Sequence, residues 1–183
     1  SFPTYMDATS TILITDLFDP LLRLKQFGAA AVADISYTDL LLGQQLGGLG
    51  AAQAGLLFLG GLFIILRGVI RWEVPLCFLI GVAFTATCFQ IADPARYAGA
   101  LFHIFSGTTI LAAFFLATED SCSPHRRLPM CLYGLTGGAL VVIIRIFGMY
   151  TDGAPFAVML INLLAPMFGL VVTRPFGWKK GDK

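Results

Sequence analysis

Five long runs of apolar residues limit what this chain can fold into. They cover about residues 50–66, 74–92, 101–117, 128–144 and 154–172. The hydrocarbon core of a bilayer is about 30 Å thick, and a helix needs roughly 20 residues to cross it, with a range of about 17–25. Because only 13% of the residues are charged, the chain has too few polar side chains to cover a surface that faces water. We therefore predict an all-α, polytopic membrane helix bundle with about five transmembrane helices.

The same runs divide the chain into three parts. Residues 1–48 are predicted to form an outer-face or interfacial segment, residues 49–173 the five-helix transmembrane region, and residues 174–183 a basic cytoplasmic tail. Within the first part, residues 17–27 predict a short amphipathic helix that lies at the membrane interface. With the C-terminus inside, eight of the twelve Lys and Arg residues fall on cytoplasmic segments. The positive-inside rule therefore predicts a cytoplasmic C-terminus, with residues 1–48 outside.

Charge and cysteine content exclude several classes of function. The formal net charge is +1, so no nucleic-acid partner is indicated. The four cysteines are far apart and contain no Cys-x-x-Cys pair for zinc or an iron–sulfur cluster, so we interpret them as small hydrophobic residues. The sequence has no Ser-His-Asp set, no zinc-ligand spacing and no phosphate-binding glycine loop. We therefore assign no catalytic residue and no metal ligand.

Several polar residues lie at or near membrane depth, where polar groups are costly and often functional. They are Gln53, Gln90, His103, Ser106, Thr108, Thr109, Arg145 and Asn162. For His103, an interfacial structural role and a cofactor contact both stay open. Asn162 predicts an interhelical hydrogen bond beside a helix break at Pro166. Arg145 ends its apolar run, and its long side chain is predicted to extend toward the interface.

A hydroxyl-rich run lies near the start of the chain. It is preceded by Asp7, contains Thr9, Ser10 and Thr11, and reaches Thr15. One interpretation is an ordinary helix cap, in which an Asp or Ser side chain accepts hydrogen bonds from free backbone amides. The other is a hydroxyl that carries a phosphate ester at the start of a helix, where amides and the helix dipole favour an anion. Composition does not choose between them.

Several blocks of the sequence resemble a known family. FHIFSGTTILAAFFLATED at residues 102–120 and RIFGMYTDGAPFAVMLINLLAPM at residues 145–167 resemble the D subunit of the bacterial Rnf electron-transport complex. They resemble more distantly the B subunit of the sodium-translocating NADH:quinone oxidoreductase. IRWEVPLCFLIG at residues 70–81 and ADPARYAGALFH at residues 92–103 fit the same family in the same order. The resemblance covers about residues 50–175.

The resemblance implies a polytopic subunit of a complex in the bacterial inner membrane. Such complexes pass electrons between ferredoxin and NAD(H) and couple that flow to the movement of sodium ions or protons. The resemblance implies two flavins: FMN, joined through its phosphate to a threonine, and riboflavin, bound without a covalent link. The implied partners are the lipid bilayer and the other membrane, flavin and iron–sulfur subunits of the complex.

The family writes its FMN attachment motif as D-x-x-S-x-A-T, usually followed by P-L. Asp7 and Ser10 have this spacing, but residues 12–13 are Ile-Leu where Ala-Thr is expected. Skipping two residues aligns Thr-Ile-Leu at residues 11–13 with Thr-Pro-Leu. The candidates for the ester are, in order, Thr11, Thr15 and Thr9. The family has several spans and a connecting segment before this point, so we interpret the 183 residues as a partial chain.

Two hypotheses from other classes stay open beside the electron-transfer subunit. A cofactor-free transporter or channel subunit would show broken helices and midplane polar residues, for which Gly60-Gly61, Asn162 and Pro166 give mild support. A scaffold subunit would only anchor partners. The leading hypothesis is a membrane flavoprotein subunit that carries electrons and has no complete active site of its own in this chain.

Overall fold

The computed structural model describes residues 20–32, 37–42, 53–94, 96–119 and 127–170. Every regular element within these ranges is helical, which confirms the all-α prediction. The elements are α2 (Pro20–Phe27), the 3₁₀ turn η1 (Ala29–Val32), α3 (Tyr37–Leu42), α4 (Ala54–Leu66), α5 (Glu73–Ala92), α6 (Ala100–Phe105), α7 (Thr109–Leu111), the π-helical turn η2 (Ala112–Leu116), α8 (Arg127–Phe147) and α9 (Ala154–Leu170).

Two of these helices are long and apolar enough to cross a bilayer. They are α5, with 20 residues, and α8, with 21 residues. The apolar helices α4 and α9 are shorter, with 13 and 17 residues. Both expose large aliphatic and aromatic side chains on their outer faces, as helices in contact with lipid do. The structure therefore supports a membrane helix bundle.

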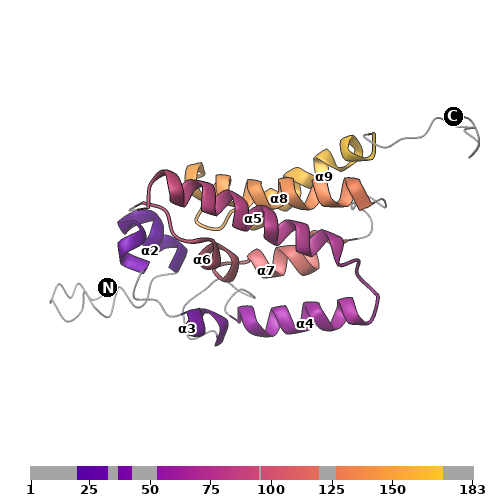
Figure 1. The fold of residues 1–183 in the computed structure, drawn as a ribbon, viewed down its shortest axis with the longest axis horizontal. Coiled ribbons are helices and arrows are strands. Elements are labelled where there is room, and N and C mark those ends of the chain that lie inside the picture. Colours follow the sequence, from indigo (N-terminus) through magenta and orange to yellow (C-terminus); the bar gives the residue numbers. More distant parts are fainter. Residues whose placement is uncertain (1–19, 33–36, 43–52, 95, 120–126, 171–183) are drawn as a thin grey trace, which may run out of the picture.

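The helices α5 and α8 form the central pair of the bundle (Figure 1). Their backbones approach closely where each helix carries a glycine. A Cβ atom added to Gly138 would collide with the carbonyl oxygen of Phe78, and one added to Gly81 would lie 2.5 Å from that of Leu135. Small residues permit such close packing between membrane helices, and this is the reason for the glycines inside the apolar runs.

The contact between α8 and α9 includes a polar pair. The Tyr133 hydroxyl donates a hydrogen bond to Oδ1 of Asn162, which confirms the predicted interhelical bond. The predicted break at Pro166 is wrong, because α9 continues through this residue to Leu170. Ile161 before the proline and Phe168 after it both pack against the core, so contacts on either side hold the helix together despite the lost backbone hydrogen bond.

At one end of the bundle, α2 covers the start of α6 (Figure 1). Pro20 opens α2, a position where its missing N–H is not needed. Leu21 is buried against Ala98 and Phe102 in a small cluster separate from the main core. The short helix predicted over residues 17–27 is thus observed from Pro20 onward, and residues 17–19 lie outside the described ranges.

The close approach of α5 and α8 predicts that a larger side chain at their contact lowers the stability of the protein. Gly138→Ala should destabilise the protein by about 2 kcal/mol, because overpacking a tight contact costs about 1–3 kcal/mol. The matched control is Gly60→Ala in α4, where the nearest atom to the added Cβ would be 3.9 Å away. Thermal unfolding in detergent measures both. Equal melting temperatures for the two variants would contradict the observed packing.

Candidate functional site

The third apolar run is interrupted between α6 and α7. Three residues, Ser106, Gly107 and Thr108, separate the two short helices, which lie end to end (Figure 1). Gly107 has a φ of +66°, a backbone conformation that favours glycine. An added Cβ would also lie 2.6 Å from Leu21 Cδ1 and 2.8 Å from Arg145 Nη2. The prediction of one helix over residues 101–117 is therefore wrong.

The break leaves carbonyl groups that have no partner within a helix. Arg145, in the last turn of α8, supplies donors to them and is only 5% exposed. Its Nη1 donates to the His103 carbonyl oxygen at 2.8 Å, and its Nη2 donates to the Ser106 carbonyl oxygen at 3.0 Å. Nη2 also donates to the Thr109 hydroxyl at 2.8 Å. The predicted extension of Arg145 toward the interface is wrong, because these oxygens hold its guanidinium inside the bundle.

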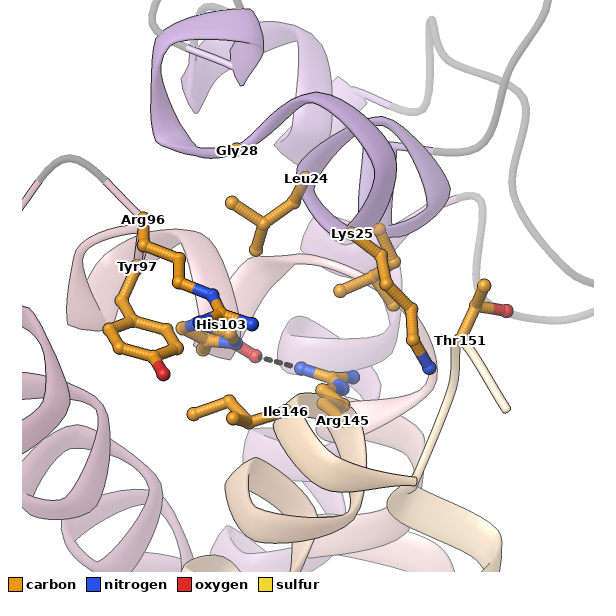
Figure 2. Close-up of a pocket in the computed structure, with 10 residues that line it drawn as sticks. Leu24, Lys25, Gly28, Arg96, Tyr97, His103, Arg145, Ile146 and Thr151 are labelled. Carbon is orange, nitrogen blue, oxygen red and sulfur yellow. Dashed lines mark hydrogen bonds between the residues drawn. The ribbon is translucent and has the colours of Figure 1, made fainter. Parts of the chain in front are cut away.

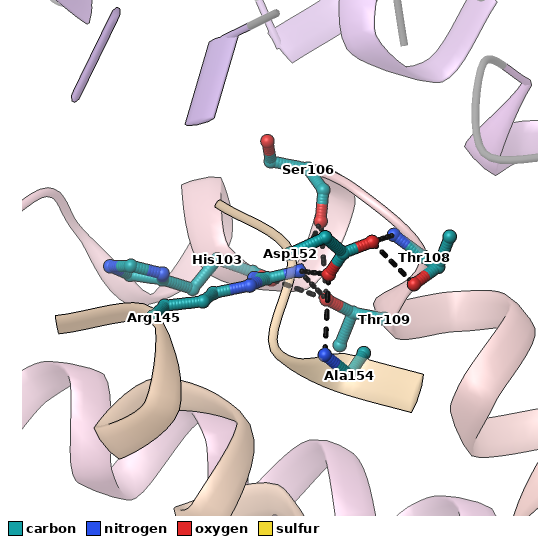
Figure 3. Close-up of polar contacts among 7 residues, drawn as sticks. All are labelled: His103, Ser106, Thr108, Thr109, Arg145, Asp152 and Ala154. Atoms are coloured by element: carbon teal, nitrogen blue, oxygen red, sulfur yellow. Dashed lines mark hydrogen bonds and ion pairs between the residues drawn. The ribbon is translucent and has the colours of Figure 1, made fainter. Parts of the chain in front are cut away.

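Asp152, in the loop between α8 and α9, completes this network (Figure 3). Its Oδ1 lies 3.1 Å from Arg145 Nη2 and accepts a hydrogen bond from the Ala154 amide at 3.3 Å. Its Oδ2 accepts hydrogen bonds from both the amide and the hydroxyl of Thr108. One carboxylate therefore connects the end of α8, the start of α9 and the start of α7.

The environment of Asp152 keeps it ionised. Burial alone would raise the pKa of its carboxyl group, but the positive charge of Arg145 and the hydrogen bonds from Thr108 outweigh burial and lower the pKa. Arg145 and Asp152 thus form an ion pair at neutral pH, in which the guanidinium is buried and the carboxylate is partly exposed. Such a pair is stabilising only when further hydrogen bonds support both groups, and here both Nη atoms of Arg145 and both carboxylate oxygens of Asp152 make such bonds.

A cavity of about 370 Å³ lies beside the network, bounded by α2, the α5–α6 loop and the end of α8 (Figure 2). We call it the basic pocket, because Lys25, Arg96 and Arg145 all line it. Tyr97 and His103 also line it. His103 is 1% exposed, and its Nδ1 has no hydrogen-bond partner among the described residues. The interfacial structural role and the cofactor contact both stay open for His103, and the structure adds that its ring borders a cavity.

The structure does not describe the residues predicted to hold the flavin. Asp7, Thr9, Ser10, Thr11 and Thr15 all lie outside the described residues, so their roles stay predictions. Sequence reasoning in turn missed the carboxylate of Asp152, which was not among the candidate residues. A signal for it was present: an arginine at the end of an apolar run needs a counter-charge, and the next carboxylate follows seven residues later.

Comparison with known proteins shows what the chain is similar to. Residues 1–177 match the family described as the NQR2, RnfD, RnfE family. The chain is 37% identical over 158 residues to the D subunit of the ion-translocating oxidoreductase complex of Alcanivorax borkumensis, covering 85% of this chain and 46% of that protein. It is 41% identical over 127 residues to the protein of the same name from Halorhodospira halophila, covering 69% and 36%. The chain therefore spans less than half the length of these relatives.

The ion pair predicts that removing its negative charge strongly lowers the stability of the protein, because the guanidinium is buried. Asp152→Asn should destabilise the protein by about 3 kcal/mol, because the buried guanidinium of Arg145 loses its counter-charge. Asp93→Asn, at the exposed end of α5, is the matched control and should leave stability nearly unchanged. Thermal or denaturant unfolding in detergent measures both, and similar losses from the two variants would contradict a special role for the pair.

The lowered pKa of Asp152 also predicts a dependence on pH. A carboxyl group with a lowered pKa stabilises the folded state above its ordinary pKa of 3.8, and this stabilisation is lost as the pH falls through the lower folded-state value. The difference in stability between the unaltered protein and Asp152→Asn should therefore be constant near neutral pH and narrow below pH 3.8. A difference that narrows already near neutral pH would show that Asp152 is not held ionised.

Proposed function

The chain belongs to the NQR2, RnfD, RnfE family, and on this premise we propose that it is a flavin-bearing membrane subunit of an ion-translocating oxidoreductase complex. The complex passes electrons between ferredoxin and NAD(H) and couples their flow to ion movement. The observation that carries the proposal is the extent of the family match. It runs over residues 1–177 and so includes the helix bundle together with the hydroxyl-rich run around Thr11.

The proposed cofactor is FMN, held by an ester between its phosphate and a threonine hydroxyl. Thr11 is the first candidate, followed by Thr15 and Thr9, and Asp7 and Ser10 are the neighbouring motif residues. A bound flavin supplies the electron-transfer chemistry, and the protein contributes position, burial and hydrogen bonds. This division of labour suits a chain in which the sequence offers no catalytic constellation.

Riboflavin is proposed as a second, non-covalent cofactor of the complex. The basic pocket is a poor match for riboflavin, because riboflavin is neutral and would leave the positive charges of Lys25 and Arg96 without a partner. We therefore assign no described residue to riboflavin. Its place in the complex is proposed from the family resemblance alone.

The proposed location is the bacterial inner membrane, with the C-terminus in the cytoplasm and residues 1–48 toward the outer face. The helix arrangement supports this topology. The ends of α5 and α8 and the start of α6 lie at the same end of the bundle as α2 (Figure 1). The charge count places each of these segments on the outer side. The proposed partners are the lipid bilayer and the other membrane, flavin and iron–sulfur subunits of the complex.

A second candidate function is supported by the broken helix. In many transporters, interrupted helices present free backbone carbonyls that bind ions or substrates. Here the break between α6 and α7 is an interruption of this kind, although Arg145 holds the His103 and Ser106 carbonyls. A transporter or channel subunit without a cofactor would use such a break in the ion path. A covalent flavin on the subunit separates the two candidates.

The proposed FMN ester predicts fluorescence that survives denaturation. On a denaturing gel, the full-length subunit should fluoresce under ultraviolet light, and a peptide ending at Arg23 should carry the mass of FMN. Thr11→Val should abolish both signals. The control is Thr87→Val, since Thr87 is an exposed residue of α5 whose hydroxyl only bonds the Ala83 carbonyl. A non-fluorescent native subunit would contradict the proposal, whereas fluorescence lost in Thr15 or Thr9 variants instead would reassign the ester.

A further inference from the structure

The basic pocket combines a concave shape with an unbalanced charge. Figure 2 shows α2 residues on one side of the pocket, with Arg145 and Ile146 of α8 on the opposite side. Its volume of about 370 Å³ falls in the range typical of small-ligand sites, about 300–1,000 Å³. Among the described residues, the lining includes two lysine or arginine side chains besides Arg145, and no carboxylate. The described lining is therefore positive.

The cations of the pocket differ in how they are held. Arg145 is neutralised by Asp152, which lies outside the pocket lining. Lys25 donates to the carbonyl oxygens of Gly148 and Tyr150, which are neutral, so its charge is not balanced by these bonds. An ammonium group has three donors, and one is left for a ligand. The α8–α9 loop thus holds the Lys25 side chain in place, and the positive charge of this lining residue is still unbalanced.

Arg96 is the more available cation. It is exposed in the α5–α6 loop, and its guanidinium lies 5.7 Å from the centre of the Tyr97 ring. A guanidinium stacked on a ring keeps its N–H groups free to bind an anion at its edge. On the inner side, the buried His103 ring has an Nδ1 with no partner among the described residues. A neutral imidazole can present this nitrogen as a donor.

We propose that the basic pocket binds a phosphate group, with Arg96 and Lys25 as the residues that contact it and His103 as a further donor. Phosphate is the anion that matches this set, because it accepts several charge-assisted hydrogen bonds at once, including two from one guanidinium. Leu24 and Ile146, on opposite sides of the pocket, give it apolar surface for whatever organic part the phosphate carries. The phosphate belongs either to a phospholipid headgroup or to a soluble phosphate compound.

The test compares ligand binding in the intact complex with that of two variants. Arg96→Gln removes the available cation, and Lys25→Gln provides a second variant in case the first is unstable. Arg67→Gln is the matched control: Arg67 is also exposed and lies 5.9 Å from the centre of the Phe63 ring, but it follows α4 and does not line the pocket. The melting temperature is measured at increasing concentrations of inorganic phosphate, with chloride at equal ionic strength as the reference. A parallel series uses nanodiscs of phosphatidylglycerol or phosphatidylcholine.

The expected result is protection that Arg96→Gln weakens about tenfold in apparent affinity and Arg67→Gln leaves unchanged. Protection by inorganic phosphate identifies a soluble phosphate ligand. Protection by phosphatidylglycerol alone identifies a lipid headgroup. The proposal is overturned if neither probe protects the complex. It is also overturned if Arg67→Gln weakens protection as much as Arg96→Gln, because the effect would then be general charge screening.

Discussion

The ion pair between Arg145 and Asp152 is the interaction on which one end of the bundle depends. Arg145 supplies hydrogen bonds to carbonyl groups exposed by the helix break, and Asp152 binds both the start of α7 and the start of α9. Without the bonds from Arg145, the His103 and Ser106 carbonyls would share the single Thr109 hydroxyl as their side-chain donor, and a backbone group left unsatisfied in lipid costs several kcal/mol. The charges and the irregular backbone therefore stabilise each other.

This arrangement has consequences for the proposed function. Because the end of α8 is tied to the break, the loops that carry Arg96 and Tyr150 and the helix α2 all meet at one place. An electron carrier needs its cofactor at a fixed distance from the next one, and a rigid support serves that need better than acid–base residues do. The hydroxyl-rich run around Thr11 precedes α2 by a few residues in the chain, so α2 is the described element nearest in sequence to the proposed FMN ester.

The sequence predicts the parts of the fold that depend on local composition. Apolar runs locate the long helices, glycines such as Gly138 indicate close packing, and Asn162 indicates a bond between helices. The break was not predictable from hydropathy, because Ser106 to Thr109 are small residues that barely lower the average of the run. The inward turn of Arg145 depends on residues up to 42 positions away, which no local pattern reveals. The proposed flavin residues lie outside the described part of the chain, so the fold does not test them.

The most direct test of this account is a double-mutant cycle on the ion pair. Unfolding free energies are measured for the unaltered protein, Arg145→Gln, Asp152→Asn and the double variant. The account predicts a coupling energy of at least about 2 kcal/mol, because either single change leaves one charge without its partner and the double change removes both charges. Single effects that add within about 0.5 kcal/mol would show that the two residues act independently, which would contradict the central role assigned to the pair.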